Sequence, residues 1–211
     1  LAQKSDVPKA RHVVLFLVDD LGWQDTSVPH HTEKTPLNER YRTPHAERLA
    51  EEGLLLRHGY ASSPVCTPTR TAIHSGQSPA RSHITYWTLY ADRDQTTPWA
   101  RKDASSLVAP AWDVNGLDQS DPTLARLFSD AGFRTVHAGK AHLGAIGSSG
   151  ADPLNLGFDV NIAGHGPGGP GSYYGQHDFR ANGRRGKPGK SVWDVPGLEA
   201  YHQKDVYLTE A

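Results

Sequence analysis

The stretch DPTLARLFSDAGFRTVHA, residues 121–138, predicts one helix and one strand separated by a glycine. Its apolar residues recur at helical spacing and share one face, namely Leu124, Ala125, Leu127 and Phe128. Asp121-Pro122 is a start signal for this helix, and Gly132 ends it. Residues 133–138 then form the expected strand. A helix followed closely by a strand is the repeating unit of α/β proteins, so this stretch indicates that class.

The same order recurs between residues 43 and 57. Thr43 is an N-cap residue, Pro44 occupies the first helical position, and Gly53 closes the predicted helix. Residues 54–57 are expected to form the strand that follows. Two units of this kind in one chain predict a βαβ architecture with a parallel sheet.

A continuous apolar run, Val13–Val18, predicts a further strand. It is rich in β-branched residues and is bounded by polar ones, the pattern of a strand buried on both faces of a parallel sheet. A short helix is also expected over residues 68–75, with Gly76 behind it.

Two long segments have no helix or strand pattern. Residues 77–119 carry Trp87, Trp99 and Trp112, and residues 164–175 include the run HGPGGPGSYY. Loops of such length in a compact domain are usually functional. We therefore expect residues 164–175 to form a surface loop and to be a candidate for contact with a substrate.

The two ends of the chain give two expectations. Residues 207–211 look like the start of a helix without a C-cap, which suggests part of a longer protein. The chain begins Leu1-Ala2-Gln3-Lys4, as after removal of a signal peptide, which predicts a secreted or periplasmic location.

Composition excludes several classes of function. The 211 residues include 22 basic and 23 acidic ones, and this balance gives no field to hold nucleic acid. The apolar run at residues 13–18 is far shorter than the roughly 20 residues that span a bilayer, so no membrane span is expected. One cysteine cannot form an internal disulfide, so that cysteine is considered for its chemistry.

Cys66-Thr67-Pro68-Thr69-Arg70 is the first candidate for chemistry. Pro68 suits the first turn of a helix, so Cys66 would lie at a helix N-terminus, where backbone N–H groups favour an anion. Arg70 is one helical turn further along the same face. A cysteine phosphatase loop needs five residues between these two positions, whereas this chain has three. A buried free cysteine beside a surface arginine is the alternative.

Asp19 and Asp20 follow the predicted strand Val13–Val18. The carboxyl ends of strands are where open α/β sheets bind ligands, and adjacent hard oxygen ligands suit Ca²⁺ or Mg²⁺ better than zinc. The alternative is that one of these carboxylates caps the next turn.

Lys140 and His142 follow the strand predicted at residues 133–138. Two positions apart in extended backbone, they would point to the same side. A fixed cation and a titrating imidazole suit a dianion or a leaving-group oxygen. The alternative is a solvated lysine and a loop histidine without a catalytic role.

Three motifs in order resemble those of type I sulfatases in the alkaline-phosphatase superfamily. They are LVDDLGW at residues 17–23, CTPTRTAIHSGQSPAR at 66–81 and GKAHLG at 139–144. The resemblance implies an alkaline-phosphatase-like, largely parallel sheet flanked by helices, with residues 1–211 as the N-terminal part of the catalytic domain. It also implies a sulfuric ester hydrolase.

The resemblance implies a set of catalytic groups. Cys66 would be oxidised to Cα-formylglycine, whose hydrate is the nucleophile, and Arg70 would neutralise charge on the sulfate. Lys140 would bind sulfate and His142 would contact the formylglycine hydroxyl. Ala141 stands where a tryptophan is often found between these two residues, so the resemblance does not predict which side chain forms this wall of the pocket.

The resemblance further implies cofactors and partners. Calcium, with magnesium as the alternative, would be held by Asp19, Asp20 and the modified Cys66. The substrate would be a sulfated small molecule or, favoured here, a sulfated glycan. A formylglycine-generating enzyme or an anaerobic sulfatase-maturating enzyme would modify Cys66. Two alternatives remain: a catalytically inactive sulfatase-like binding domain, and a phosphatase or phosphodiesterase of the same superfamily.

Overall fold

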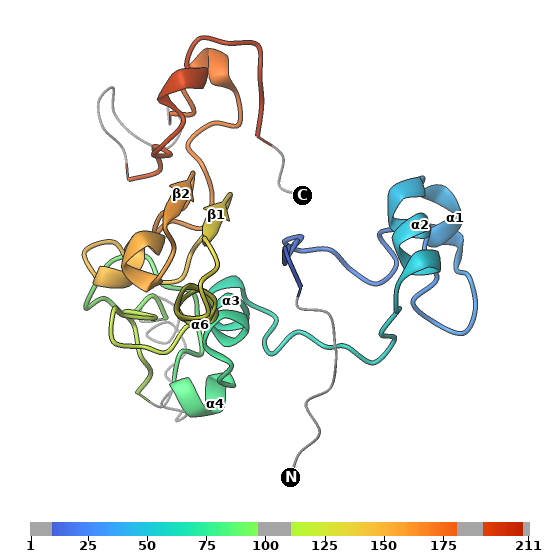
Figure 1. The fold of residues 1–211 in the computed structure, drawn as a ribbon, viewed down its shortest axis with the longest axis horizontal. Helices are drawn as coiled ribbons and strands as arrows, with labels where there is room; N and C mark the ends of the chain where they lie inside the picture. Colours follow the sequence, from blue (N-terminus) through green and yellow to red (C-terminus); the bar gives the residue numbers. More distant parts are fainter. Residues whose placement is uncertain (1–9, 97–110, 181–191, 209–211) are drawn as a thin grey trace. The chain divides into compact units, whose positions relative to one another are not determined.

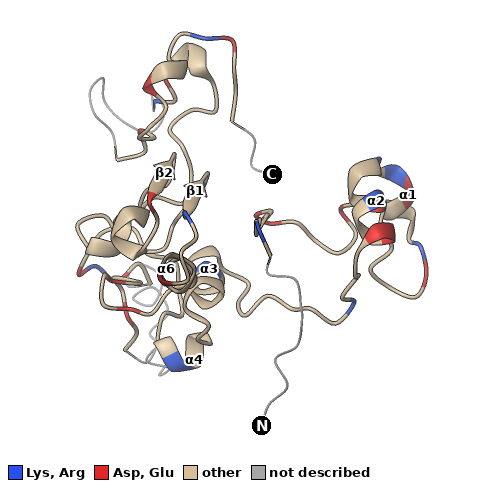
Figure 2. Ribbon diagram, viewed as in Figure 1, with Lys and Arg blue, Asp and Glu red and all other residues tan. Residues whose placement is uncertain are grey.

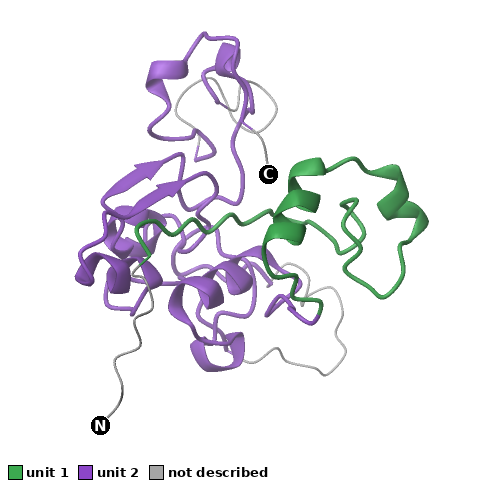
Figure 3. Ribbon diagram, turned by 45° about the vertical axis from the view of Figure 1, so that its right-hand side comes forward, with its two compact units in different colours: residues 1–57, 210–211 green, residues 58–209 purple. Residues whose placement is uncertain are grey.

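The computed structural model describes residues 10–96, 111–180 and 192–208, which fall into two compact units. Figure 3 colours residues 1–57 with 210–211 as unit 1 and residues 58–209 as unit 2. Each unit is considered by itself below.

Unit 1 contains two helices in its described part, α1 (Pro36–Arg40) and α2 (Pro44–Glu52), drawn in blue in Figure 1. The expected helix at residues 44–52 is confirmed, with Thr43 at its N-cap and Gly53 at its C-cap. Helix α1 was not predicted. Its Asn38 is 1% exposed and donates through Nδ2 to the carbonyl of Thr26 at 2.8 Å, which holds the helix on the preceding loop.

Neither of the strands predicted in this part of the chain forms. Residues 13–18 are irregular, with Val14 86% and Phe16 73% exposed, and Leu54 is 82% exposed. A strand satisfies its N–H and C=O groups only through a neighbouring strand. The described residues of unit 1 include no strand with which residues 13–18 could pair. The apolar sequence alone therefore does not produce a strand there.

Unit 2 contains a small parallel sheet with helices around it. Strand β1 (Val136–Ala138) pairs with β2 (Val160–Ile162), and Val136 lies opposite Val160 in the register. The short 3₁₀ helices η1 (Ser149–Ala151) and η2 (Pro153–Leu156) lie on the crossover that parallel pairing requires. The α/β class predicted from the sequence is confirmed, with a sheet of two strands among the described residues.

Three α-helices accompany the sheet in the described part of unit 2. They are α3 (Cys66–Ser75), α4 (Pro79–Ser82) and α6 (Leu124–Asp130). Helices α3 and α6 lie side by side in Figure 1. Helix α6 begins later than expected, because Thr123 rather than Asp121-Pro122 caps it and accepts from the amide of Arg126. Helix α4 was hidden in the segment 77–119, and Trp99 lies outside the described residues.

The main hydrophobic cluster of unit 2 includes the segment that follows β1. Its members are Ile84, Leu117, Ala141, Leu143 and Leu156, each no more than 2% exposed. A second cluster comprises Ala163, Phe179, Val195 and Leu198. The GKAHLG segment is thus anchored in the core by two of its own apolar side chains.

The glycine-rich segment 164–175 begins without helix or strand, as expected, and it lies at the surface only in part, since residues 168–173 are half-buried and Tyr174 is 55% exposed. Gly164, Gly166 and Pro167 are buried. A glycine-rich chain has little side-chain bulk, which lets its backbone pass close to other segments.

The helix expected from residue 207 does not begin there, since Tyr207 forms an antiparallel bridge with Tyr174. Residues 209–211 lie outside the described part.

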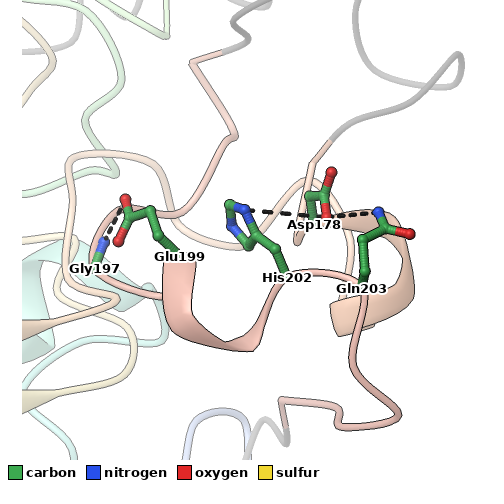
Figure 4. Close-up of polar contacts among 5 residues, drawn as sticks. All are labelled: Asp178, Gly197, Glu199, His202 and Gln203. Atoms are coloured by element: carbon green, nitrogen blue, oxygen red, sulfur yellow. Dashed lines mark hydrogen bonds and ion pairs between the residues drawn. The ribbon is translucent and has the colours of Figure 1, made fainter.

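The last part of unit 2 is held by polar side chains (Figure 4). The Asp178 carboxylate accepts from Gln203 Nε2 at 2.7 Å and lies 4.0 Å from His202 Nδ1, and Glu199 accepts from the amide of Gly197. These contacts connect the 3₁₀ helices η3 (Gly175–His177) and η4 (Glu199–Tyr201) through their flanking residues.

Charged residues of both signs are distributed along the described parts of the chain. Figure 2 shows basic and acidic segments interspersed on both units. No helix within the described ranges has the length and apolar character needed to cross a bilayer.

Candidate active site

Helix α3 begins at Cys66, so the cysteine lies at the helix N-terminus as expected. The preceding Val65 is extended and caps without a side-chain bond, and Gly76 closes the helix in the left-handed conformation at φ 68°. Thr67 and Thr71 are fully buried and anchor the helix, which leaves Cys66 half-buried at its open end.

Arg70 connects α3 with the segment that follows β1. Its Nη1 donates to the carbonyl oxygen of Lys140 at 2.6 Å, and the side chain is 6% exposed. Burying a guanidinium is costly unless hydrogen bonds compensate it. The alternative of a surface arginine is therefore wrong, and Arg70 belongs to the interior of unit 2.

Two buried histidines lie around Arg70. Burial, then His137 and then the charge of Arg70, lower the pKa of His74 to about 4. Burial and Arg70 likewise lower the pKa of His137 to about 4, despite opposing hydrogen bonds from Asn161 and the Lys140 backbone. Both rings meet Phe158 edge-on, at centroid distances of 5.8 and 5.3 Å. At neutral pH both imidazoles are neutral, so they add no charge beside Arg70.

His142 is almost fully buried, at 3% exposed, and has left-handed backbone at φ 50°. A non-glycine residue in that region is strained by roughly 1–2 kcal/mol. Its amide donates to the carbonyl of His165 at 3.2 Å, and its ring Nε2 lies 2.8 Å from the carbonyl oxygen of Thr88. A carbonyl oxygen can only accept, so Nε2 carries a proton in this bond.

Lys140 and His142 do not follow the alternation of extended backbone. Gly139, at φ 99°, and His142 both turn the chain, and Lys140 is half-buried whereas His142 is buried. The Gly139 amide donates to Ile162 O at 2.8 Å, which ties this turn to β2. The expectation that both side chains share a side through period-two geometry is wrong.

The structure links the segments that carry the four catalytic candidates of unit 2. Arg70 bonds to Lys140, and Thr88 joins α3 to His142, because its amide donates to Thr67 Oγ1 at 3.2 Å while its carbonyl accepts from the His142 ring. Cys66 is the residue next to Thr67. The sequence held no signal for Thr88, since Thr88 makes both bonds through its backbone.

Two of the three predicted metal ligands, Asp19 and Asp20, lie in unit 1. Asp19 and Asp20 form a turn in which Asp20 is exposed at φ 55° and Asp19 is half-buried. The next turn is closed by Asp25, whose carboxylate accepts from the Gly22 amide at 2.8 Å. Two adjacent carboxylates have the donor chemistry of a hard cation. Within residues 10–96, 111–180 and 192–208, no three His, Cys, Asp or Glu residues gather as a ready metal-binding group.

A cavity of about 330 Å³ adjoins the His142 segment. Its lining includes Ile146, Asp152, Asn161, His165 and Pro196. Burial lowers the pKa of His165, with the Trp193 backbone and the Asp194 carboxylate opposing that shift. Asn161 already uses both ends of its amide on the Gly164 backbone, and both ring nitrogens of His165 are buried.

Comparisons with known proteins cover nearly the whole chain. A sequence model of the sulfatase family matches residues 11–204. The chain is 30% identical to N-acetylgalactosamine-6-sulfatase of Homo sapiens over 193 residues, which are 92% of this chain and 31% of the human protein. It is 32% identical over 162 residues to steryl-sulfatase of Mus musculus, covering 75% of this chain and 22% of that one. For an arylsulfatase of Hemicentrotus pulcherrimus the identity is 31% over 153 residues, 70% of this chain and 23% of that one. The chain thus spans less than a third of the length of these relatives.

Proposed function

The chain belongs to the sulfatase family, and from that premise we propose that the protein hydrolyses the sulfate ester of an alcohol. The observation that supports the proposal is a pair of links between segments: Arg70 of α3 bonds to the Lys140 carbonyl, and the Thr88 backbone bonds both to Thr67, the neighbour of Cys66, and to the His142 ring. The four catalytic candidates supply a nucleophile position, two cations and an imidazole, which suit transfer of the SO₃ group from an anionic sulfate ester to the nucleophile.

The nucleophile comes from position 66. Formylglycine made from Cys66 supplies, as its hydrate, one hydroxyl for attack on sulfur and a second whose deprotonation releases sulfate. The α3 N-terminus favours the negative charge of the sulfate group, because its first amides have no partner within the helix.

Arg70 and Lys140 neutralise the transferred group. Arg70 is fixed by its bond to the Lys140 carbonyl, so its remaining N–H groups keep a defined direction. Lys140 adds a second positive charge from the same segment. Charges held in place in a partly water-free site stabilise the developing charge of the transition state without reorganisation.

His142 exchanges the proton of the attacking or departing hydroxyl. Its ring is held by the Thr88 carbonyl, and an imidazole is the side chain best suited to proton exchange near neutral pH. His74 and His137 do not take this role in the proposal, because with pKa values of about 4 their imidazoles are weak bases at neutral pH.

The metal ligands in the proposal are Asp19, Asp20 and the modified residue 66. Calcium fits two adjacent carboxylates, and magnesium is the second choice. A bound cation would polarise the sulfate oxygens.

The direct test is peptide mass spectrometry on the segment that contains Cys66, from protein made in its native host. Conversion of the thiol to formylglycine lowers the mass by about 18 Da. Replacing Cys66 with Ala in the full-length protein should abolish sulfate release and leave the thermal unfolding midpoint close to wild type. An unmodified thiol in an active protein would overturn the proposal, and calcium binding without turnover would support a binding domain instead.

We propose a sulfated carbohydrate as the substrate. Support comes from the printed name of the N-acetylgalactosamine-6-sulfatases to which the chain is similar. A panel of sulfated monosaccharides, sulfated oligosaccharides, steroid sulfate and nitrophenyl sulfate, compared by kcat/KM, tests this choice. A preference for the steroid or aryl ester would refute it.

The proposal also includes a partner and a location. Cys66 requires a formylglycine-generating enzyme or an anaerobic sulfatase-maturating enzyme, and a polymeric glycan is met outside the cytoplasm, so we place the protein in the periplasm or outside the cell. Coexpression with and without a maturation enzyme, followed by cell fractionation, tests both parts. Full modification without any such enzyme, or retention in the cytoplasm of the native host, would contradict them.

A further inference from the structure

Thr67 follows Cys66 in the first turn of α3, and its side chain is fully buried at 0% exposed. Its hydroxyl oxygen accepts from the backbone amide of Thr88 at 3.2 Å, a bond that leaves the helix for a segment 21 residues further along the chain. Cys66 itself is only half-buried at the open end of the helix. The Thr67 hydroxyl is therefore a buried attachment point directly beside the position proposed for the nucleophile.

Thr88 is in turn held by the segment that follows β1. Its carbonyl accepts from His142 Nε2 at 2.8 Å, and the carbonyl of the next residue, Leu89, accepts from the amide of Ile146 at 2.7 Å. The His142 ring is closely packed on its other edge, because a Cβ atom on Gly168 would lie 2.7 Å from Nδ1, closer than real Cβ atoms approach other atoms. Thr88 thus has contacts outside α3 that define its place.

Two buried threonines of α3 differ in where their hydroxyl groups bond. Thr67 and Thr71 are both 0% exposed and lie about one helical turn apart. Thr71 Oγ1 donates to the carbonyl of Pro68 at 3.2 Å, within the helix, whereas Thr67 Oγ1 bonds to another segment. Thr88 contributes its backbone to this contact, so a substitution at position 67 can remove the bond and one at position 88 cannot.

We propose that Thr67 is a positioning residue, whose hydroxyl holds the first turn of α3, and with it residue 66, in a fixed position relative to the GKAHLG segment. The bond from Arg70 to the Lys140 carbonyl attaches the helix to the same segment about one turn further on. Two attachments define the place of the helix end better than one. A small displacement of a reacting group slows the chemical step more than it weakens binding. The effect on turnover rests on the proposed function, whereas the hydrogen bond itself does not.

The first measurement is independent of activity and of any variant. Amide hydrogen exchange, followed by NMR of uniformly nitrogen-labelled full-length protein at neutral pH, should show the Thr88 amide protected to a degree similar to the Leu117 amide. That reference amide donates to the Leu143 carbonyl at 2.9 Å within the main hydrophobic cluster. Exchange of the Thr88 amide at the rate of an unstructured peptide would overturn the proposal. This result is decisive even if a variant at position 67 does not fold.

The second measurement compares Thr67→Val with Thr71→Val in matured, full-length protein. Both substitutions remove a fully buried hydroxyl from α3 and retain the branched shape of the side chain. We expect Thr67→Val to speed exchange of the Thr88 amide about tenfold, with the Leu117 amide unchanged. The same variant should lower kcat about tenfold, calculated per converted residue 66 as counted by mass spectrometry, with a smaller change in KM. Thr71→Val should leave exchange at Thr88 and kcat at wild-type values.

Thr67→Ser is the conservative variant, because it retains the acceptor for the Thr88 amide, and it should recover most of both losses. Equal effects of Thr67→Val and Thr71→Val would refute the positioning role. So would an unchanged kcat in Thr67→Val, or a rise in exchange shared by the Leu117 amide, which reports loosening of the whole fold. Absence of sulfate release from matured wild type would instead count against the proposed function, with the exchange comparison still testing the hydrogen bond.

Discussion

At the residue scale, Arg70 combines two tasks that only a guanidinium can perform together. It donates one N–H to the Lys140 carbonyl and, in the proposed mechanism, offers others to sulfate. A lysine ammonium is a point charge without the fork geometry that allows both. The buried position of Arg70 thus gives the charge a fixed direction.

We predict that Arg70→Lys lowers kcat/KM by roughly 10²- to 10³-fold, the usual effect of removing one positioned donor from a transition state. The measurement is steady-state sulfate release from matured protein. Arg81→Lys on α4 is the matched control, because Arg81 is exposed, and it should behave as wild type. A loss of less than threefold for Arg70→Lys would remove Arg70 from the mechanism.

The buried histidines predict an acid-sensitive fold. Burial and the nearby Arg70 charge lower the pKa of both His74 and His137 from 6.5 to about 4, so the unfolded chain binds their protons more readily than the folded one. The resulting stability is complete above pH 6.5 and is lost as the pH falls towards 4. Each histidine contributes on the order of 3 kcal/mol to the free energy of unfolding at neutral pH, and the two contributions are coupled.

The free energy of unfolding, measured by urea denaturation at pH 7 and at pH 4.5, tests this dependence. Replacing His74 with Leu should flatten the loss between the two pH values. His83→Asn serves as control, because His83 is exposed and Asn tolerates its left-handed backbone at φ 58°. A profile for His74→Leu as steep as wild type would show that the pKa of His74 is not depressed.

At the element scale, helix α6 depends on its cap. Thr123 is 1% exposed, accepts from the Arg126 amide and donates through Oγ1 to Leu156 O at 2.5 Å. Thr123→Ala should destabilise the protein by about 1–3 kcal/mol, since it removes the cap and leaves the Leu156 carbonyl without its donor.

Thr123→Ser retains the hydroxyl and should recover most of that loss, as measured by chemical denaturation of both variants. A Ser variant as unstable as the Ala variant would indicate that the methyl group, not the two hydrogen bonds, stabilises this helix end.

The helices could be predicted from the sequence, whereas most of the strands could not. Local signals such as Thr43-Pro44 and Gly53, or Pro68 and Gly76, lie within or directly beside the helices that they delimit, so α2 and α3 could be predicted. A strand depends on a partner distant in sequence, and residues 13–18 have none in unit 1 as described. Only β1, which pairs with β2, was found, in a shortened form.

Part of the candidate site could likewise be predicted from the sequence, and part could not. The spacing from Cys66 to Arg70 is a property of one helix and was visible in the sequence. The role of Thr88 was not, because it acts through its amide and carbonyl, which every residue has. The contact between Gly168 and His142 depends on a missing side chain at close approach, which only the folded chain reveals.

At the scale of the whole molecule, the proposed metal ligands are Asp19, Asp20 and the residue made from Cys66. We predict that calcium raises the thermal midpoint of the full-length wild type, and that Asp19→Asn weakens calcium affinity and sulfate release together. Titration calorimetry and turnover measure the two effects. Glu52→Gln, an exposed change on α2, is the control, and an unchanged calcium titration for Asp19→Asn would place the metal elsewhere.

The exposed run at residues 13–18 has a consequence for handling the protein. Val14 and Phe16 are mostly exposed, and the run VVLFLV has six consecutive β-forming residues without a charge or proline. Such a segment with unpaired backbone is a template for edge-to-edge aggregation and for cross-β fibrils. In concentrated solution, fibrils are therefore expected to form first through residues 13–18. The substitution Val14→Lys should slow their formation, because a charge interrupts the apolar run.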